Sequence, residues 1–191
     1  MTFCPPRSAR PKASPNLPLN SDRSRRPVGD GELLTRLEPV FRASARVLVL
    51  GSLPGAMSLA QAQYYAHPRN QFWSLIGAVI GEDLAVLEYA ARLCRLGERR
   101  IALWDVVASG YRQGSLDAAL RVAERTDLAR LIQQLPELRA VAFNGQLAAA
   151  QAPETAEALA RVTLPSSSPA NTMPFAIKLK QWRAIAAFLD D

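Results

Sequence analysis

The sequence predicts an α/β fold: a three-layer α/β/α sandwich with a central four-stranded parallel sheet. Two observations lead to this fold class. Short apolar runs alternate along the chain with stretches of helical periodicity. The apolar runs are bounded by polar residues or by Gly and Pro, as strands are. Strands that alternate with helices in this way form parallel sheets covered by helices on both faces.

Four runs are predicted to be strands: residues 46–50, 100–104, 139–143 and 161–164. A segment of chemical interest follows each of them: GSLPG at 51–55, Asp105, Asn144-Gly145, and LPSSSPAN at 164–171. Ligands of parallel α/β sheets bind outside the carboxyl ends of the strands, near the point where strand order reverses. We therefore expect one pocket at this edge of the sheet.

The segments between the strands are predicted to be helical. The expected helices are residues 31–41, 72–80, 84–96, 116–123, 127–134, 146–150, 154–160 and 175–189. Thr126 is the expected N-cap of the helix at 127–134, and Gly97 the expected end of the helix at 84–96. In the last helix Phe175, Leu179 and Trp182 share one face, which predicts docking against the core.

The length of 191 residues suits one domain, expected at 31–191, with a tail at 1–30. Residues 1–28 hold six basic side chains and one acidic one, and so carry +5 of the formal net charge of +6. Six prolines and little apolar content predict that this tail is disordered. Either it is an electrostatic arm that attracts nucleic acid phosphates, or it is an extension without function.

The composition excludes several classes of protein. Cys4 and Cys94 are the only cysteines and His67 is the only histidine, so we expect no disulfide scaffold, no metal and no iron–sulfur cluster. Two cysteines fit a reducing cytoplasm. The sequence contains neither an apolar run long enough to cross a membrane nor the apolar core of a signal peptide. No membrane association is expected.

Two polar loops contain the residues most suited to chemistry. The first, QYYAHPRNQFW at 63–73, has an aromatic and amide content that a folded core does not need. The second is PSSSPAN at 165–171, which supplies hydroxyls and an amide. Phe72 and Trp73 begin a helix with Ile76 and Ile80 behind them, and we expect both aromatic side chains to be core.

The two loops, the VLVLGSLPG segment at 47–55, ALWDV at 102–106 and GSLD at 114–117 together resemble the uracil-DNA glycosylase superfamily. Within it, the sequence is most similar to the hypoxanthine-DNA (deoxyinosine) glycosylases, over residues 33–190. The resemblance implies a monomeric enzyme that works without a cofactor, in the cytoplasm with the nucleoid. It would flip a deaminated base, hypoxanthine in deoxyinosine, out of DNA. Hydrolysis of the N-glycosidic bond would then leave an abasic site.

One departure from the superfamily bears on the mechanism. Mismatch-specific relatives carry GINPG in the first motif, with a water-orienting Asn at the third position. Leu53 occupies that position here and can neither orient a water nor accept a proton. The resemblance places the important amide at Asn70, whose oxygen would hold the attacking water. His67 either supplies a proton or positive charge to the departing base or is a structural hydrogen-bonding residue.

The resemblance also suggests how the base is held. Tyr65 is the position expected to stack on the flipped base. Hydrogen-bond donors facing the departing purine would lower the barrier to bond cleavage. The candidate base-binding residues, besides Tyr65, are Gly51, Ser52, Leu53, Pro54, Gly55 and Asn144.

The loop at 165–171 is expected to contact DNA. Either its serines, Ser166, Ser167 and Ser168, contact the DNA backbone, or the loop is an ordinary surface connection. Asn171 and Met173 would probe the gap left by the extruded nucleotide, with Met173 as a wedge. Arg69 either contacts a phosphate or is a solvated surface charge. Asp105 either orients a water or caps the turn that follows it.

The predicted activity is therefore that of a monofunctional glycosylase acting on double- or single-stranded DNA. No Lys lies in either loop to form the Schiff base that strand cleavage would need. Two alternatives remain open. The same fold could act on uracil, thymine or xanthine, or the chain could be a non-catalytic binder of damaged or single-stranded DNA.

Overall fold

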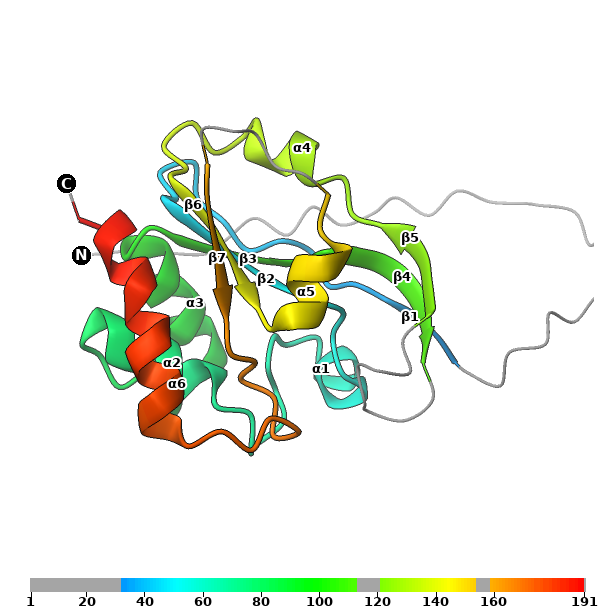
Figure 1. The fold of residues 1–191 in the computed structure, drawn as a ribbon, viewed down its shortest axis with the longest axis horizontal. Coiled ribbons are helices and arrows are strands. Elements are labelled where there is room, and N and C mark those ends of the chain that lie inside the picture. Colours follow the sequence, from blue (N-terminus) through cyan, green and yellow to red (C-terminus); the bar gives the residue numbers. More distant parts are fainter. Residues whose placement is uncertain (1–31, 113–120, 154–158, 191) are drawn as a thin grey trace, which may run out of the picture. The chain divides into compact units, whose positions relative to one another are not determined.

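Four parallel strands form the central sheet of the computed structural model, which describes residues 32–112, 121–153 and 159–190 (Figure 1). They are β2 (Val47–Gly51), β3 (Ile101–Asp105), β6 (Ala140–Asn144) and β7 (Ala160–Leu164), in the order β3-β2-β6-β7. The predicted four-stranded parallel sheet is confirmed. The predicted disordered tail at 1–30 lies outside the described residues, which all belong to the unit Gly31–Asp191.

The strand order reverses beside β2. The chain passes from β2 to β3 on one side and then crosses to β6 on the other side, so the carboxyl ends of β2 and β6 flank the reversal. Gly51 pairs with Asp105 across β2 and β3, and Leu50 pairs with Phe143 across β2 and β6. Residues that end three different strands thereby meet at one edge.

Helices cover one face of the sheet, as predicted. They are α2 (Phe72–Ile80), α3 (Tyr89–Glu98) and α6 (Phe175–Trp182), which continues as the 3₁₀ helix η3 (Arg183–Phe188). Figure 1 shows the three α-helices on the same side of the central sheet. Phe72, Trp73 and Trp182 are buried there against alternate residues of the strands, such as Val47 and Val49. The expected core role of Phe72 and Trp73 is confirmed. The expected docking of the last helix is confirmed for Leu179 and Trp182, but Phe175 at its start is exposed, so the prediction was wrong for that residue.

The other face is covered by helices and by a second sheet. The helices are α4 (Leu128–Ile132) and α5 (Gln146–Gln151), and the strands β1 (Glu32–Thr35), β4 (Val107–Arg112) and β5 (Arg121–Arg125) form an antiparallel sheet in the order β1-β4-β5. Leu48 and Leu50, which alternate with the residues of the first face, are buried here. The three-layer fold is confirmed, but the antiparallel sheet was not predicted.

Two predicted helices are wrong because strand pairing overrides local periodicity. Residues 31–41 contain β1, in which buried Leu34 alternates with half-exposed Leu33, and Val40 forms a bridge with Leu103 of β3. Of the helix predicted at 116–123, residues 121–123 belong to β5, which pairs with β4. The remainder of that prediction, and residues 154–158 of the helix predicted at 154–160, lie outside the described residues; Ala160 begins β7.

Several helix ends differ from expectation. The segment at 84–96 divides into the 3₁₀ helix η1 (Leu84–Val86) and α3, which passes through Gly97 to Glu98. Gly97 is a point of close packing, since a Cβ there would lie 2.6 Å from Arg42 Nε. Thr126 is not the cap of α4. Asp127 caps it by accepting a hydrogen bond from the Arg130 NH at 3.1 Å.

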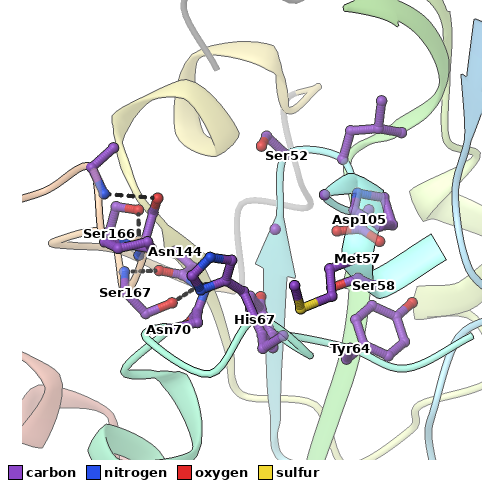
Figure 2. A pocket seen from close by; sticks show the side chains of 18 of the residues that line it. Ser52, Met57, Ser58, Tyr64, His67, Asn70, Asp105, Asn144, Ser166 and Ser167 are labelled. Atoms are coloured by element: carbon purple, nitrogen blue, oxygen red, sulfur yellow. Dashed lines mark hydrogen bonds between the residues drawn. The ribbon is translucent and has the colours of Figure 1, made fainter. Parts of the chain in front are cut away.

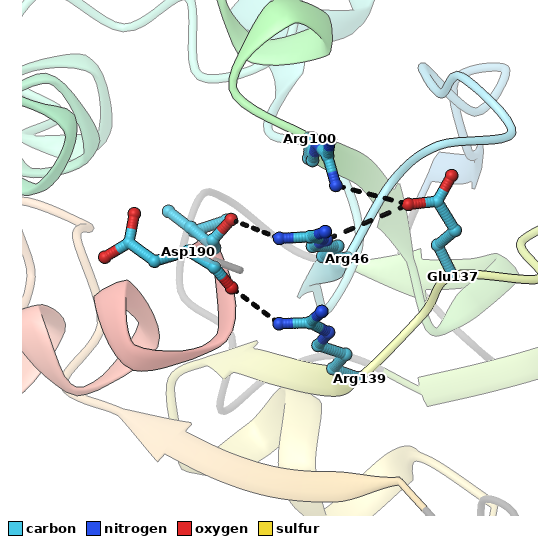
Figure 3. Close-up of polar contacts among 6 residues, drawn as sticks. Arg46, Arg100, Glu137, Arg139 and Asp190 are labelled. Carbon is cyan, nitrogen blue, oxygen red and sulfur yellow. Dashed lines mark hydrogen bonds and ion pairs between the residues drawn. The ribbon is translucent and has the colours of Figure 1, made fainter.

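The edge of the sheet opposite the carboxyl ends carries a polar clamp (Figure 3). Arg46, only 5% exposed, donates from Nη1 to the Leu189 carbonyl at 2.9 Å, and its Nε lies 3.8 Å from the Glu137 carboxylate. Arg139 donates to the Asp190 carbonyl at 2.6 Å. These contacts hold the C-terminal segment against the beginnings of β2 and β6.

Candidate active site

A cavity of about 620 Å³ lies at the carboxyl edge of the central sheet (Figure 2). Both predicted loops contribute to it, together with the ends of β2, β3 and β6. Its lining comprises residues 51–58, Tyr64, Tyr65, His67, Arg69, Asn70, Asp105, Asn144 and residues 166–170. The structure thus brings all but two of the predicted site residues around one space, and the exceptions are Asn171 and Met173.

The turn after β2 forms one wall. The carbonyls of Gly51 and Ser52 accept hydrogen bonds from the NH groups of Val106 and Val107, both at 3.0 Å, which tie the turn to the end of β3. A Cβ on Gly51 would lie 2.5 Å from Asp105 Oδ1 and 3.2 Å from the Tyr65 hydroxyl oxygen. Glycine at this position therefore permits two side chains to approach the backbone closely.

The later residues of the turn differ from Gly51 in their surroundings: Leu53 is buried, and Gly55 faces open space. Leu53 is 5% exposed and packs with the core on the second face of the sheet, although it also lines the cavity. A Cβ added to Gly55 would meet open space. After Gly55 the chain forms the short helix α1 (Ala56–Gln61), which was not predicted and which adds Met57 and Ser58 to the lining.

Tyr65 has an unusual backbone conformation and a supported ring. Its φ of 54° lies in the left-handed region, which non-glycine residues rarely adopt and which is often found at functional sites. The ring stacks on Phe72 with centroids 3.8 Å apart and planes 15° apart. Phe72 is fully buried. The core therefore supports a tyrosine that lines the cavity.

Tyr64, next to it, also contributes to the lining, but most of the residue is buried in the core. Its hydroxyl donates to the Glu38 carbonyl at 3.1 Å, and the residue is 3% exposed. Burial, and after it the negative charge of Asp105, raises the pKa of Tyr64 well above its ordinary value. Tyr64 therefore anchors this part of the lining to the core.

The amide of Asn70 is oriented by the start of α2. Its Oδ1 accepts a hydrogen bond from the Phe72 NH at 2.9 Å, and its own NH donates to the His67 carbonyl at 2.8 Å. The bond to the Phe72 NH was not foreseen from the sequence. A carbonyl oxygen has a second lone pair, so this bond fixes the direction of the amide and leaves an acceptor site on the oxygen.

His67 is held by the loop that carries it. Its Nδ1 accepts a hydrogen bond from the Arg69 NH at 3.1 Å. Because Nδ1 is an acceptor, the neutral imidazole carries its hydrogen on Nε2. Arg69 lines the cavity mouth and is itself exposed.

Asn144 and Ser167 hold one another. The Asn144 Nδ2 donates to Ser167 Oγ at 2.8 Å, and its Oδ1 accepts from the Ser167 NH at 2.8 Å. Ser167 is fully buried, and its hydroxyl joins the loop to β6 through this contact. Ser166 and Ser168 are half-buried and line the cavity.

Asn171 and Met173 lie across the loop from the main cavity. They line a neighbouring cavity of about 450 Å³, which shares Ser166, Ser168 and Ala170 with the first. Asn171 Nδ2 donates to the Ser166 carbonyl at 3.1 Å, and its Oδ1 accepts from the Met173 NH at 3.1 Å. The end of the loop is thereby folded back on its beginning.

Two charged side chains at the site are buried, and only the first was noted in the sequence. Asp105 was expected at the end of its strand, and it is 3% exposed and lies against Gly51 in the cavity lining. Lys178 was missed entirely and is 1% exposed on α6. A signal was present, because Lys178 precedes Trp182 by four residues and therefore lies on the core-facing side of the helix.

Among the described residues, no group of three or more His, Cys, Asp or Glu side chains is arranged to hold a metal ion. In the same part of the chain, none of the helices has both the length and the apolar character needed to cross a membrane.

Comparisons with known proteins agree on one family. The model of the uracil DNA glycosylase superfamily matches residues 38–190. Hypoxanthine DNA glycosylase of Methanosarcina acetivorans is 37% identical over 147 residues, which cover 76% of this chain and 93% of that protein. Hypoxanthine DNA glycosylase of Methanosarcina barkeri is 43% identical over 108 residues, covering 56% and 68%.

A solved structure gives the same result for the fold. A solution NMR structure from Methanosarcina acetivorans, described provisionally as a uracil DNA glycosylase, matches with a TM-score of 0.74 and 34% identity. The match covers 84% of this chain and 100% of that one.

Proposed function

Because the chain belongs to the uracil DNA glycosylase superfamily, we propose that it releases hypoxanthine from deoxyinosine in DNA by hydrolysing the N-glycosidic bond and leaving an abasic site. The observation that carries this proposal is the meeting of Asn70, Tyr65 and the serine loop around one cavity. The similarity to two hypoxanthine DNA glycosylases supports the choice of base.

The cavity suits a single extruded base. Its volume of about 620 Å³ falls within the range of small-molecule sites, about 300 to 1,000 Å³. The base would stack on the ring of Tyr65, which Phe72 supports from behind. Such stacking replaces part of what the base loses when it leaves the duplex.

Asn70 would place the attacking water. Hydrolysis of a deoxynucleoside passes through a cationic sugar that captures even a weak nucleophile, so positioning the water matters more than deprotonating it. The bond from the Phe72 NH fixes the direction of the Asn70 amide. The second lone pair of Oδ1 would accept a hydrogen bond from the water.

The departing purine gains negative charge, which donors in the cavity would stabilise. Nε2–H of His67 is one candidate, because Nδ1 of the same ring is engaged by the Arg69 NH. Backbone NH groups of the turn at 51–55 are others. Asn144 would act mainly by holding Ser167, since both ends of its amide bond to that residue.

We propose that the enzyme performs no lyase step. The lysines of the chain are Lys12, Lys178 and Lys180. Within the described residues, neither Lys178 nor Lys180 lines the cavity. The Lys178 ammonium is engaged by Gln71 and Asn171. A Schiff base with the abasic sugar would require a free amine in the cavity.

The proposal extends to the setting of the enzyme. It would act as a monomer, in the cytoplasm with the nucleoid, on double- or single-stranded DNA that contains a deaminated base. Residues 31–191 would form the glycosylase domain, and the basic tail at 1–30 would add a salt-sensitive attraction to DNA phosphates.

A panel of labelled oligonucleotides tests the proposal, each with one altered base: hypoxanthine, uracil, mismatched thymine or xanthine. We expect the inosine strand to become alkali-labile and to remain intact without alkali. An inosine strand that resists alkali after incubation would refute the assignment, and release of another base would favour that substrate. Tight binding without release of any base would favour the non-catalytic alternative.

A further inference from the structure

Lys178 is a buried cation below the site. It lies in α6, is 1% exposed, and its Nζ donates to two oxygens, the Asn171 carbonyl and Gln71 Oε1, both at 2.8 Å. Burying a charged group is costly unless hydrogen bonds compensate for the lost water. In keeping with this cost, burial lowers the pKa of Lys178.

The two acceptors belong to the two loops of the site. Asn171 ends the serine loop, and Gln71 directly follows Asn70. The Gln71 NH also donates to the Ser167 carbonyl at 3.0 Å. The two loops are therefore joined once by a backbone hydrogen bond and once through Lys178.

A second contact from α6 holds the beginning of the serine loop. One turn after Lys178, Trp182 is fully buried and its Nε1 donates to the Pro165 carbonyl at 2.9 Å. The same helix thus binds the loop at 165 and at 171, on either side of the serines. Because a helix turn has a fixed rise, these two contacts fix the span of the loop.

The chemistry of Lys178 indicates that it connects the two loops and does not simply stabilise the core. An apolar side chain on this face of α6 would pack against the core without the desolvation cost, and buried polar groups often contribute little net stability compared with apolar replacements. The ammonium contributes what an apolar residue cannot, namely two directed hydrogen bonds to separate segments.

We propose that Lys178 is a positioning residue for base release, which holds Asn70 and the serine loop in the relative placement that the reaction needs. This inference rests on the proposed function. Lys178 lines neither cavity, so it acts through Gln71 and Asn171 without touching the substrate. Displacement of a reacting group by about 1 Å can lower the rate about 100-fold, so a loosened loop should reduce turnover.

The test replaces Lys178 by Met, which keeps the length of the side chain and removes the ammonium. Lys180→Met is the matched control, because it removes the same charge from an exposed position of the same helix. In single-turnover assays on the altered-base strand from which the unmodified protein releases base, we expect Lys178→Met to release base about 10- to 100-fold more slowly. Its affinity for that DNA should change less than about 3-fold, and Lys180→Met should keep its rate.

Hydrogen–deuterium exchange of residues 165–171 gives a readout independent of activity. We expect faster exchange in Lys178→Met and no change in Lys180→Met, because only the former releases the loop. If the unmodified protein releases no base at all, the proposed function is wrong. The exchange measurement still tests whether Lys178 holds the serine loop in place. Unchanged exchange would overturn the inference.

Gln71→Leu removes the oxygen that accepts the hydrogen bond from Lys178 and leaves the lysine in place. This variant tests the proposal if Lys178→Met does not fold. We expect the same selective loss of rate in Gln71→Leu. In the double variant the losses should not multiply, because the two side chains act as one unit. A release rate within about 3-fold of normal, or equal losses of rate and of DNA affinity, would show that Lys178 does not position the site.

Discussion

The side chain of Asn70 has two roles, one in the proposed reaction and one in the stability of the fold. Its oxygen accepts a hydrogen bond from the Phe72 NH at the start of α2, and this bond directs the amide of Asn70, which lines the cavity. A hydrogen bond of this kind contributes about 1 kcal/mol to stability. A substitution at this position therefore changes stability and turnover together, and the two effects must be measured separately.

We expect Asn70→Ala to lower the rate of base release by about 100-fold or more and to leave DNA affinity within about 3-fold, since water placement matters only in the reaction. It should also lower the free energy of unfolding by about 1 kcal/mol, because it removes the hydrogen bond from the Phe72 NH. Asn70→Asp keeps an oxygen that can accept this bond and serves as the stability control. Equal losses of rate and affinity in Asn70→Ala would assign the side chain to docking.

The two glycines of the first motif are expected to differ. Gly51→Ala would place a Cβ 2.5 Å from Asp105 Oδ1, and such overpacking typically costs about 1 to 3 kcal/mol. Gly55→Ala meets open space, and Gly55 has a φ of −72° that alanine adopts readily. Thermal denaturation should show a lower midpoint for Gly51→Ala and an unchanged one for Gly55→Ala. Equal midpoints would show that Asp105 can move away without cost.

Tyr64 predicts a pH dependence of stability. Its pKa in the folded protein is raised, so the folded state disfavours the tyrosinate that forms in the unfolded chain above about pH 10. The contribution of Tyr64 is therefore complete below that pH and is lost as the pH rises toward the folded pKa. Tyr64→Phe removes the hydrogen bond to the Glu38 carbonyl and should cost about 1 kcal/mol at neutral pH.

Urea denaturation at pH 7 and pH 11 checks this expectation. The difference between the unmodified protein and Tyr64→Phe should shrink at pH 11, because only the former contains the group that ionises. Tyr89, whose pKa burial also raises, is present in both proteins and cancels in the comparison. A difference that stays constant with pH would contradict the prediction.

Among the helices and strands, the sequence predicted correctly those whose pattern lies within the segment itself. Helix α2 was predicted with its bounds of Phe72–Ile80, because its apolar spacing is intrinsic to the segment. Strand β1 was missed, because its residues become a strand only when Leu33 and Leu34 pair with Tyr111 and Gly110 of β4. Partners so distant in sequence leave no mark on the local pattern.

Two substitutions test whether Asp127, and not Thr126, caps α4. Asp127→Ala removes the hydrogen bond to the Arg130 NH and should lower the free energy of unfolding by about 1 kcal/mol. Thr126→Val should be neutral or stabilising, because the Thr126 hydroxyl is buried with no hydrogen-bond partner among the described residues. Chemical denaturation of both variants checks this, and a larger loss in Thr126→Val would restore Thr126 as the cap.

At the scale of the whole sheet, chemistry and anchoring lie at opposite edges. The carboxyl ends of the strands carry the cavity, and the amino ends carry the clamp around Arg46 (Figure 3). We expect Arg46→Met to lower the free energy of unfolding by about 2 kcal/mol, since it removes a charged hydrogen bond from a buried position.

We expect Arg46→Met to lower stability without lowering activity. Base release at low temperature should stay within about 2-fold of normal, because the clamp lies at the far edge from the cavity and changes outside a site usually act independently of it. Arg139→Met, from an exposed position that contacts the Asp190 carbonyl, should cost less. A large loss of rate in Arg46→Met would indicate coupling between the two edges.

The sequence by itself determined the parallel sheet, the edge at which its loops gather, and the family that those loops resemble. These follow from apolar runs, turn residues and motifs, each of which is contained in a few neighbouring positions. Only the tertiary structure decided that Ser167 bonds to Asn144 and that Lys178 joins the loops. Hydrogen bonds between segments far apart in the chain depend on how the packed elements meet, and no local pattern encodes that.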